Sequence, residues 1–362
     1  MKVMFFIPTL SSGGAERVVS VLSNEMSDRG IDVTIALIIN EVCVYKLSPL
    51  VKTLCLDSEG DIALPAVKRV LTRYRKIREA VKSNKPDVVI SFMSNTNIDV
   101  SIALMGLDIP LIVSERNDPK IFPASKAKQL MRRFAYLKPK GFVFQTPDAQ
   151  AYFSKRIQKK SEIILNPLSE NLPSLFEGGR DKRIVAVGRL DPQKNYGLLL
   201  KSFKDFLESH SEHFLEIYGE GPQKKQVEEM ISSLGLDDSV KLQGFCKDVH
   251  EKILTAGMFV MSSDFEGMPN ALLEAMALGL PCISTDCPCG GPRMMIENKI
   301  NGILVPVNDT NALTQAMMFV ADNVEEAEKM GKKASEIREK TKVNSIVDRW
   351  MNYIFKIYER EK

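Results

Sequence analysis

Short apolar runs alternate with amphipathic stretches along the whole chain, and this pattern limits the fold more than any other feature. Strand-like runs include residues 2–8 (KVMFFIP), 86–92 (PDVVISF) and 184–189 (IVAVGR), and a helical periodicity first follows from Gly14 to about Arg29. Strands that alternate with helices pair in parallel, with the helices packed on the faces of the sheet. The pattern therefore predicts an α/β protein with parallel sheets.

The length of the chain and one irregular segment predict two domains. A chain of 362 residues is long for a single domain. Residues 166–182 (NPLSENLPSLFEGGRDK) are rich in proline, glycine and polar types, which is typical of a linker. We expect Rossmann-like domains at residues 1–165 and 183–342, a cleft between them, and a C-terminal helix at 343–362 that packs back on the first domain.

The composition disfavours several classes of protein. The apolar runs are too short to cross a bilayer, and the first one lacks a cleavage-like site, so we interpret it as a strand. The 6 cysteines of this long chain do not predict a disulfide framework. Cys287 and Cys289 form a C-x-C without the second pair or histidine cluster of a zinc site. We therefore expect a reduced, cytoplasmic setting.

The charge of the chain is unevenly distributed between its halves. Residues 1–160 contain 25 Lys and Arg against 15 Asp and Glu, whereas residues 161–362 contain 24 against 31. Such asymmetry predicts that the first half faces an anionic surface or substrate.

Residues 258–279 (MFVMSSDFEGMPNALLEAMALG) combine a strand, a turn and a helix that we expect to start near Pro269. The first N–H groups of a helix, here on Asn270 and Ala271, form a site for an anion. Glu266 precedes the helix and Glu274 lies inside it, so an elongated ligand with its anion at the helix tip would meet a carboxylate at each end. Carboxylates accept hydrogen bonds from sugar hydroxyls. An ordinary turn with solvated glutamates is the alternative for this stretch alone.

Two further turns carry residues suited to anion binding. Gly13 and Gly14 lie in TLSSGGAER (9–17), where the absence of side chains lets a phosphate or sugar approach the backbone. This turn is not G-x-G-x-x-G, which disfavours a nicotinamide enzyme. In GRLDPQKN (188–195), Arg189 and Lys194 flank a strand-to-helix connection and can converge on one anion. A tight connection and two exposed basic residues are the respective alternatives.

Taken together, these segments resemble the retaining glycosyltransferases of family 4, which have the two-domain GT-B fold. The resemblance rests on EGMPNALLEAMA (266–277), GRLDPQKN, YGEGP (218–222), LQGF (242–245), Asn166-Pro167 and the TLSSGGAER turn. It implies that Arg189 and Lys194 hold the nucleotide diphosphate and that these two residues and Glu266 act in catalysis. It also implies a donor site made of the following residues: Gly13, Gly14, Arg189, Lys194, Cys246, Glu266, Met268, Pro269, Asn270, Ala271 and Glu274.

Residues 65–85 predict a helix with one apolar face and one basic face. The basic face has Lys68, Arg69, Arg73, Arg75 and Lys76, with Glu79 as the only acid of the segment. Attraction to anionic lipid is worth about 1 kcal/mol per basic residue near the surface. We expect Lys68, Arg69, Arg73 and Lys76 to contact an anionic membrane or the pyrophosphate of a lipid-linked acceptor. A merely solvated face is the alternative, and no recognition motif or interleaved aromatic residues accompany the charges to favour nucleic-acid binding.

The segment SERND (114–118) follows an expected strand and so lies at the edge where ligands bind. Many members of the family carry a histidine near here, whereas this chain has Arg116. Arginine stays protonated and cannot act as a base, but it can neutralise a phosphate of the acceptor. This departure leaves the chemistry on the acceptor side open.

The resemblance implies transfer of a sugar, with retention of configuration, from a uridine diphosphate (UDP) sugar to a polyprenyl-diphosphate-linked saccharide of a bacterial surface or glycoprotein glycan. The first domain would bind the acceptor and the second the donor, for which we expect N-acetylgalactosamine. No metal or cofactor is expected, because two cations and helix termini can stabilise the leaving diphosphate. We expect the protein on the inner face of the cell membrane. A UDP-sugar 2-epimerase of this fold and a non-catalytic membrane adaptor are the alternatives.

Overall fold

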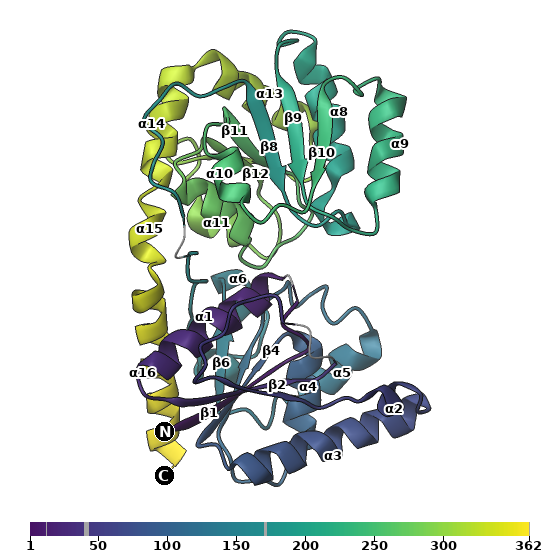
Figure 1. Ribbon diagram of the computed structural model, residues 1–362, viewed down its shortest axis with the longest axis vertical. Coiled ribbons are helices and arrows are strands. Elements are labelled where there is room, and N and C mark those ends of the chain that lie inside the picture. Colours follow the sequence, from purple (N-terminus) through teal and green to yellow (C-terminus); the bar gives the residue numbers. More distant parts are fainter. Residues whose placement is uncertain (12, 40–42, 170–171, 362) are drawn as a thin grey trace. The chain divides into compact units, whose positions relative to one another are not determined.

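The computed structural model describes residues 1–11, 13–39, 43–169 and 172–361. Its contacts divide the chain into two units: unit 1 is Met1–Pro167 with Val343–Lys362, and unit 2 is Leu168–Lys342. Each unit is built on its own parallel sheet (Figure 1). Ser12 of the glycine-rich turn and residues 170–171 of the predicted linker lie outside the described residues. In the described part of the chain, no helix is long and apolar enough to cross a bilayer.

The sheet of unit 1 has the strand order β3-β2-β1-β4-β5-β6-β7. Its register places Phe5 beside Ile35 on one neighbouring strand and beside Ile90 on the other. The strands are β1 (Lys2–Ile7), β2 (Asp32–Leu37), β3 (Lys52–Cys55), β4 (Val88–Phe92), β5 (Leu111–Ser114), β6 (Gly141–Phe144) and β7 (Ser161–Ile163). β4, β5 and β6 are buried along their whole length, as expected for parallel strands covered on both faces.

The helices of unit 1 come from both ends of the chain. They are α1 (Gly14–Asp28), α2 (Glu59–Ile62), α3 (Ala66–Asn84), α4 (Ser94–Ala103), α5 (Lys126–Ala135), α6 (Pro147–Ala151), α7 (Lys155–Gln158) and α16 (Val343–Glu361). Trp350 of α16 stacks on Phe92 with ring centroids 5.6 Å apart, and the hydroxyl of Tyr353 accepts a hydrogen bond from the N–H of Phe142 (2.9 Å). The last helix of the chain is therefore part of the core of unit 1.

The sheet of unit 2 has the strand order β10-β9-β8-β11-β12-β13. The strands are β8 (Arg183–Val187), β9 (Phe214–Tyr218), β10 (Val240–Gly244), β11 (Met258–Met261), β12 (Cys282–Thr285) and β13 (Ile303–Val305). The helices are α8 (Tyr196–Leu207), α9 (Lys224–Leu234), α10 (Val249–Ile253), α11 (Asn270–Ala277), α12 (Gly291–Met295), α13 (Thr310–Asp322), α14 (Val324–Ala334) and α15 (Ile337–Lys340). α8, α9 and α13 share one buried core with the sheet, and α11 contacts β11, β12 and α10.

The alternation of strands and helices in the sequence predicts this architecture correctly. β3 (KTLC) and β7 (SEI) were not predicted from the sequence, because their side chains are exposed or half-buried and form no apolar run. Both strands pair at the edges of the unit 1 sheet, where a strand needs few apolar residues.

Candidate active site

β11 and α11 of unit 2 form the predicted strand–turn–helix. The strand is fully buried, and the helix buries Leu272, Leu273 and Met276. Pro269 is not the first helical residue but the N-cap, with an extended ψ of 112°, so α11 begins at Asn270. The carbonyl of Pro269 accepts a hydrogen bond from the N–H of Leu273 (3.1 Å). The N–H groups of residues 270–272 therefore form the amino-terminal end of α11.

Lys194 and Glu266, which are far apart in the sequence, form an ion pair. Lys194 ends the 3₁₀ turn Pro192–Lys194, and its Nζ lies 2.6 Å from Oε1 of Glu266. The two side chains are only 18% and 8% exposed, and Ser263 donates a second hydrogen bond to the same Oε1 (2.8 Å). An ammonium has three hydrogens, so Lys194 can bind an anion while it stays paired with Glu266.

Arg189 lies on the same loop but points to a different partner. Its Nη2 is 2.7 Å from Oδ2 of Asp191, and its side chain is 71% exposed. Exposed pairs of this kind contribute little free energy, so a phosphate can compete for the guanidinium. The structure thus places Arg189 beside Asp191 rather than in the Lys194–Glu266 pair.

Glu274 is held by a residue that the sequence did not single out. Its Oε2 lies 3.0 Å from Nε2 of His250, which belongs to α10. Cys246 is half-buried and lies in the loop between β10 and α10, beside the exposed ring of Phe245. The predicted ribose contact and the predicted base contact are therefore linked through one short helix.

The loop between β12 and α12 supports Glu266. The sequence analysis did not predict this support. The N–H of Glu266 donates to the carbonyl of Pro288 (2.7 Å), and the N–H of Cys289 donates to the carbonyl of Glu266 (3.0 Å). A Cβ at position 291 would lie 1.7 Å from the carbonyl oxygen of Gly267, so only glycine allows this approach. The Gly-Gly pair at residues 290–291 was the available signal for this close contact.

The glycines of YGEGP allow the backbone of the loop that carries Arg189 to approach closely. A Cβ at position 219 would lie 2.0 Å from the carbonyl oxygen of Gly188, and one at position 221 would lie 2.3 Å from that of Leu190. The N–H of Leu190 also donates to the carbonyl of Glu220 (3.0 Å). These glycines therefore let two loops cross at the carboxyl edge of the sheet.

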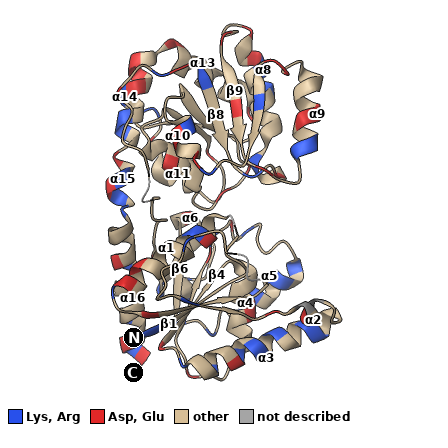
Figure 2. Cartoon of the chain, in the orientation of Figure 1, with Lys and Arg blue, Asp and Glu red and all other residues tan. Residues whose placement is uncertain are grey.

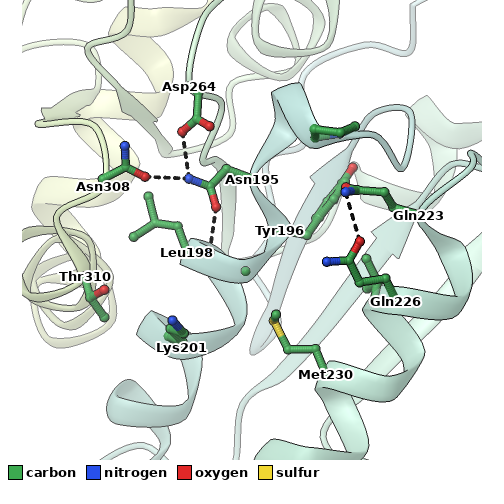
Figure 3. Close-up of a pocket in the computed structure, with 13 residues that line it drawn as sticks. Asn195, Tyr196, Leu198, Lys201, Gln223, Gln226, Met230, Asp264, Asn308 and Thr310 are labelled. Carbon is green, nitrogen blue, oxygen red and sulfur yellow. Dashed lines mark hydrogen bonds between the residues drawn. The ribbon is translucent and has the colours of Figure 1, made fainter.

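A cavity of about 400 Å³ adjoins the same loop on the side of α8 and α9 (Figure 3). Asn195 lines this cavity and donates hydrogen bonds to Oδ1 of Asp264 (2.7 Å) and Oδ1 of Asn308 (2.8 Å). Its own Oδ1 accepts from the N–H of Leu198 (3.1 Å) and caps α8. Asn195 thus fixes the end of the Lys194 loop against the turn that precedes Glu266.

The glycine-rich turn of unit 1 is built around a carboxylate of its own. Gly13 is the N-cap of α1 and Gly14 is its first residue. A Cβ at position 13 would lie 2.2 Å from Oε2 of Glu16, and the hydroxyl of Tyr45 donates to the carbonyl of Gly13 (2.8 Å). The side chain of Glu16 therefore occupies the space over Gly13.

Arg116 lies at the end of β5, and it is buried. Its side chain is stacked over the ring of Phe92 at 4.4 Å, and Nη1 donates to Oδ1 of Asn166 (2.8 Å). Nε and Nη2 are buried without a hydrogen-bond partner in the described residues. Burial lowers the pKa of Arg116 to about 9. A buried cation without a carboxylate partner is costly, and an anion at Nε or Nη2 would relieve that cost.

The helix α3 is not the free basic face that its sequence predicts. Arg73 pairs with Asp57 (2.8 Å) and with Asp99 (3.5 Å). Lys76 pairs with Asp61 and is only 25% exposed. Acids from other segments of unit 1 therefore pair with both cations that the sequence analysis expected at a membrane or acceptor phosphate.

The first half of α3 exposes both its basic and its apolar residues. Lys68 is exposed, and Arg69 is partly exposed. Val67 is 74% exposed and Leu71 is 60% exposed, although both share the expected apolar face. Only the second half of this face, which includes Ile77 and Val81, is buried.

The helix α5 buries a cation and exposes large apolar side chains, the reverse of an ordinary amphipathic helix. Arg132 is 3% exposed and donates to the carbonyls of Phe122 (2.6 Å) and Pro119 (2.8 Å). Leu130 is 67% exposed and Phe134 is 58% exposed. Basic residues lie along both α3 and α5 in Figure 2. The sequence signal was available, since residues 119–147 contain 7 Lys and Arg and no acid.

The described residues include no group of three or more His, Cys, Asp or Glu side chains that could hold a metal ion. Cys287 and Cys289 are buried, and burial raises the pKa of the Cys287 thiol to about 12.

Both halves of the chain match known glycosyltransferase families. Residues 12–171 match the model described as Glycosyltransferase Family 4, and residues 169–337 match the model described as Glycosyl transferases group 1. The chain therefore belongs to these glycosyltransferases, and the resemblance drawn from its motifs is confirmed.

Two enzymes of Campylobacter jejuni are similar to the chain over most of its length. The GalNAc-alpha-(1->4)-GalNAc-alpha-(1->3)-diNAcBac-PP-undecaprenol alpha-1,4-N-acetyl-D-galactosaminyltransferase is 27% identical, and the alignment covers 99% of each chain. The N-acetylgalactosamine-N,N'-diacetylbacillosaminyl-diphospho-undecaprenol 4-alpha-N-acetylgalactosaminyltransferase is 27% identical over 89% of this chain and 90% of that enzyme.

The fold is shared with solved structures of low sequence identity. Anabaena Alr3699/HepE in complex with UDP and glucose superimposes with a TM-score of 0.80 at 15% identity, over 98% of this chain and 100% of that one. The predicted fold, two α/β domains of the GT-B type, is confirmed.

Proposed function

We propose that the chain transfers a sugar from a UDP-sugar to a polyprenyl-diphosphate-linked saccharide, with retention of configuration. The observation that carries the proposal is the buried Lys194–Glu266 pair beside the amino-terminal end of α11, the helix that also holds Glu274. In this proposal Lys194 lies where the diphosphate leaves, and the carboxylates of Glu266 and Glu274 contact the two ends of the donor. The names of the Campylobacter relatives, both of which act on an undecaprenol-linked glycan, support the acceptor class.

The proposed reaction needs no metal ion. The bond between the anomeric carbon and the phosphate oxygen breaks, and its electrons leave with UDP. Lys194, Arg189 and the first N–H groups of α11 stabilise the charge that develops on the diphosphate. The acceptor hydroxyl forms its bond to the anomeric carbon on the same face, and its proton passes to the departing phosphate oxygen. Glu266 orients the sugar, and Glu274 binds the ribose.

N-acetylgalactosamine is the sugar that we propose for the donor. The support comes from the names of both Campylobacter relatives, each an N-acetylgalactosaminyltransferase. UDP as the nucleotide is supported by the solved structure of Anabaena Alr3699/HepE with UDP.

Unit 1 carries the surface that we propose for an anionic membrane. Leu130, Met131 and Phe134 of α5 are exposed, as are Val67 and Leu71 of α3. Apolar side chains among cations insert into the interface of an anionic bilayer.

The cations of unit 1 have different parts in this proposal. Lys68 and Arg69 belong to the membrane surface, whereas Arg73 and Lys76 stay in their ion pairs within unit 1. Arg116 is proposed to meet a phosphate of the acceptor.

A panel of nucleotide sugars, each incubated with short-chain polyprenyl-diphosphate saccharides, tests the transfer. We expect a mass increase of one or more N-acetylhexosamines with UDP-N-acetylgalactosamine only, and α configuration by nuclear magnetic resonance. Activity unchanged by EDTA would support a metal-free reaction, and its loss would contradict it. A changed donor without acceptor would identify an epimerase, and vesicle binding without UDP binding would identify an adaptor.

A further inference from the structure

We propose that His250 is a positioning residue that holds Glu274 ready for the ribose of the nucleotide. The proposal rests on the donor role of Glu274 given above. Its own support is the contact between two helices, α10 and α11, that carry these side chains. Nε2 of His250 lies 3.0 Å from Oε2 of Glu274.

The burial of the two side chains makes this contact more than a surface pair. His250 is 19% exposed and Glu274 is 14% exposed. Because an ionised carboxylate only accepts hydrogen bonds, Nε2 of His250 must carry the hydrogen of this bond. Hydrogen bonds to a charged group that is shielded from water are stronger than those between neutral groups.

The chemistry of a carboxylate suits Glu274 to a diol. A carboxylate has two oxygens with about four lone-pair sites. Two neighbouring ribose hydroxyls can therefore donate hydrogen bonds to the same group that His250 holds. A glutamate side chain loses up to about 2 kcal/mol of rotamer freedom when it is fixed. The bond to His250 means that this cost is met before the nucleotide arrives, which favours binding.

The position of His250 in the chain ties ribose recognition to base recognition. α10 follows the loop that contains Phe245 and Cys246, where the base contact is predicted. A single short helix therefore sets both the loop for the base and the carboxylate for the ribose. His250 is the residue through which α10 contacts the carboxylate directly.

Calorimetric titration with UDP tests the proposal in the full-length chain through a double-mutant cycle. The variants are His250→Ala, Glu274→Ala and the double variant, with Lys252→Ala on the exposed side of the same helix as the matched control. We expect His250→Ala to weaken UDP binding about tenfold, in the range of a lost hydrogen bond to a charged group. The effect should vanish in the Glu274→Ala background, and Lys252→Ala should bind like the wild type.

A conservative variant separates positioning from a structural role. Glutamine at position 250 keeps an N–H donor at a similar reach, so we expect His250→Gln to bind UDP within about threefold of the wild type. In transfer assays, His250→Ala should raise the KM for the donor and leave kcat nearly unchanged. Circular dichroism should give the same melting temperature for His250→Ala and His250→Gln.

Equal losses from His250→Ala in the wild-type and Glu274→Ala backgrounds would overturn the proposal, because His250 would then act independently of Glu274. Unchanged UDP binding in His250→Ala would overturn it too. A different result, wild-type binding of UDP by Glu274→Ala, would overturn the donor role of Glu274 itself. That outcome is distinguishable because it appears in the single variant that leaves His250 in place.

Discussion

The two units share an architecture but differ in how the charged side chains at the carboxyl edge of each sheet are paired. At the carboxyl edge of the unit 2 sheet, Lys194 pairs with Glu266, and Glu274 is held by His250. At the corresponding edge of unit 1, Arg116 is buried with Nε and Nη2 unpartnered in the described residues. Unit 1 also exposes apolar side chains on α3 and α5, while Arg132 lies inside.

The difference fits two kinds of ligand. A small, highly charged ligand such as a nucleotide sugar is best bound by groups that are already oriented, because little reorganisation is then needed. An acceptor on a lipid carrier is itself amphipathic, with apolar chain and phosphate side by side. Unit 1 offers exposed apolar residues and cations on α3 and α5 and, separately, a buried arginine whose Nε and Nη2 have no partner among the described residues, and both features suit that chemistry.

The largest effect should come from breaking the pair in unit 2. Lys194→Ala should lower kcat by about two to three orders of magnitude, the cost of losing a group that stabilises developing negative charge. Steady-state transfer with saturating donor measures the loss. Vesicle binding, a property assigned to unit 1, should not change. A variant that kept near-normal turnover would contradict the role of Lys194.

The next largest effect should come from the exposed face of α5. The double change Leu130→Ser and Phe134→Ser should weaken binding to anionic vesicles at least tenfold, since a buried large apolar side chain is worth about 1.5–3 kcal/mol. Flotation with vesicles of defined composition measures it. UDP affinity should stay the same, because the changes lie in the other unit.

Val324→Ser is the matched control for α5. Val324 is 56% exposed but belongs to unit 2, so its replacement should leave vesicle binding intact. If this control loses as much binding as the α5 variant, exposed apolar surface in general, and not α5, holds the protein on the membrane.

Replacing Arg116 should have two smaller effects of opposite sign, one on the stability of the fold and one on transfer activity. Burial lowers its pKa to about 9, so below that pH the guanidinium is protonated in the folded protein and its burial costs stability relative to the unfolded chain. Arg116→Met should therefore leave stability unchanged or raise it by about 1 kcal/mol, as for other buried charges replaced by apolar residues. Transfer should fall about tenfold through a higher KM for the lipid-linked acceptor. Chemical denaturation and kinetics measure the two effects, and a clear loss of stability would show that Arg116 is structural.

The smallest effect is a change in melting temperature, and it concerns the ion pair between Lys76 of α3 and Asp61. Hydrogen bonds from Lys76 and Ser58 hold the pKa of Asp61 well below its ordinary value of 3.8. A carboxylate with a lowered pKa stabilises the fold above its unfolded pKa, and this contribution is lost as the pH falls below about 4. Asp61→Asn should thus reduce the drop in melting temperature between pH 5 and pH 3. An unchanged slope would show that the Lys76–Asp61 pair does not stabilise unit 1.

Much of the candidate site in unit 2 could be predicted from the sequence because several of its residues lie on one short segment. Glu266, Pro269 and Glu274 share a strand–turn–helix whose periodicity shows which side chains are buried. The structure adds partners from other segments: His250 for Glu274, and residues 288–291 for the turn around Glu266. Contacts between distant segments leave no periodic signal in the sequence.

The charged helices of unit 1 were harder to predict, because contacts with other segments decide which of their side chains are buried. The α3 sequence shows one acid among many bases, yet the acids that pair with Arg73 and Lys76 come from outside the helix. In α5, Arg132 donates to carbonyls of the preceding loop and lies 3.8 Å from the buried carboxylate of Glu115, so a cation takes the inner position that an apolar residue normally holds. The periodicity of apolar residues would place the exposed apolar side chains of such a helix inside and its buried arginine outside.

The path of the chain has a consequence for biosynthesis. Unit 2 is inserted between the two segments of unit 1, and the N–H of Leu168 donates to the carbonyl of Thr341 (2.9 Å) where the chain enters and leaves it. Unit 1 needs Trp350 and Tyr353 to complete its core. On the ribosome, the unit whose residues begin first is therefore finished last, and a protein cut short before residue 343 would lack a helix of its amino-terminal half.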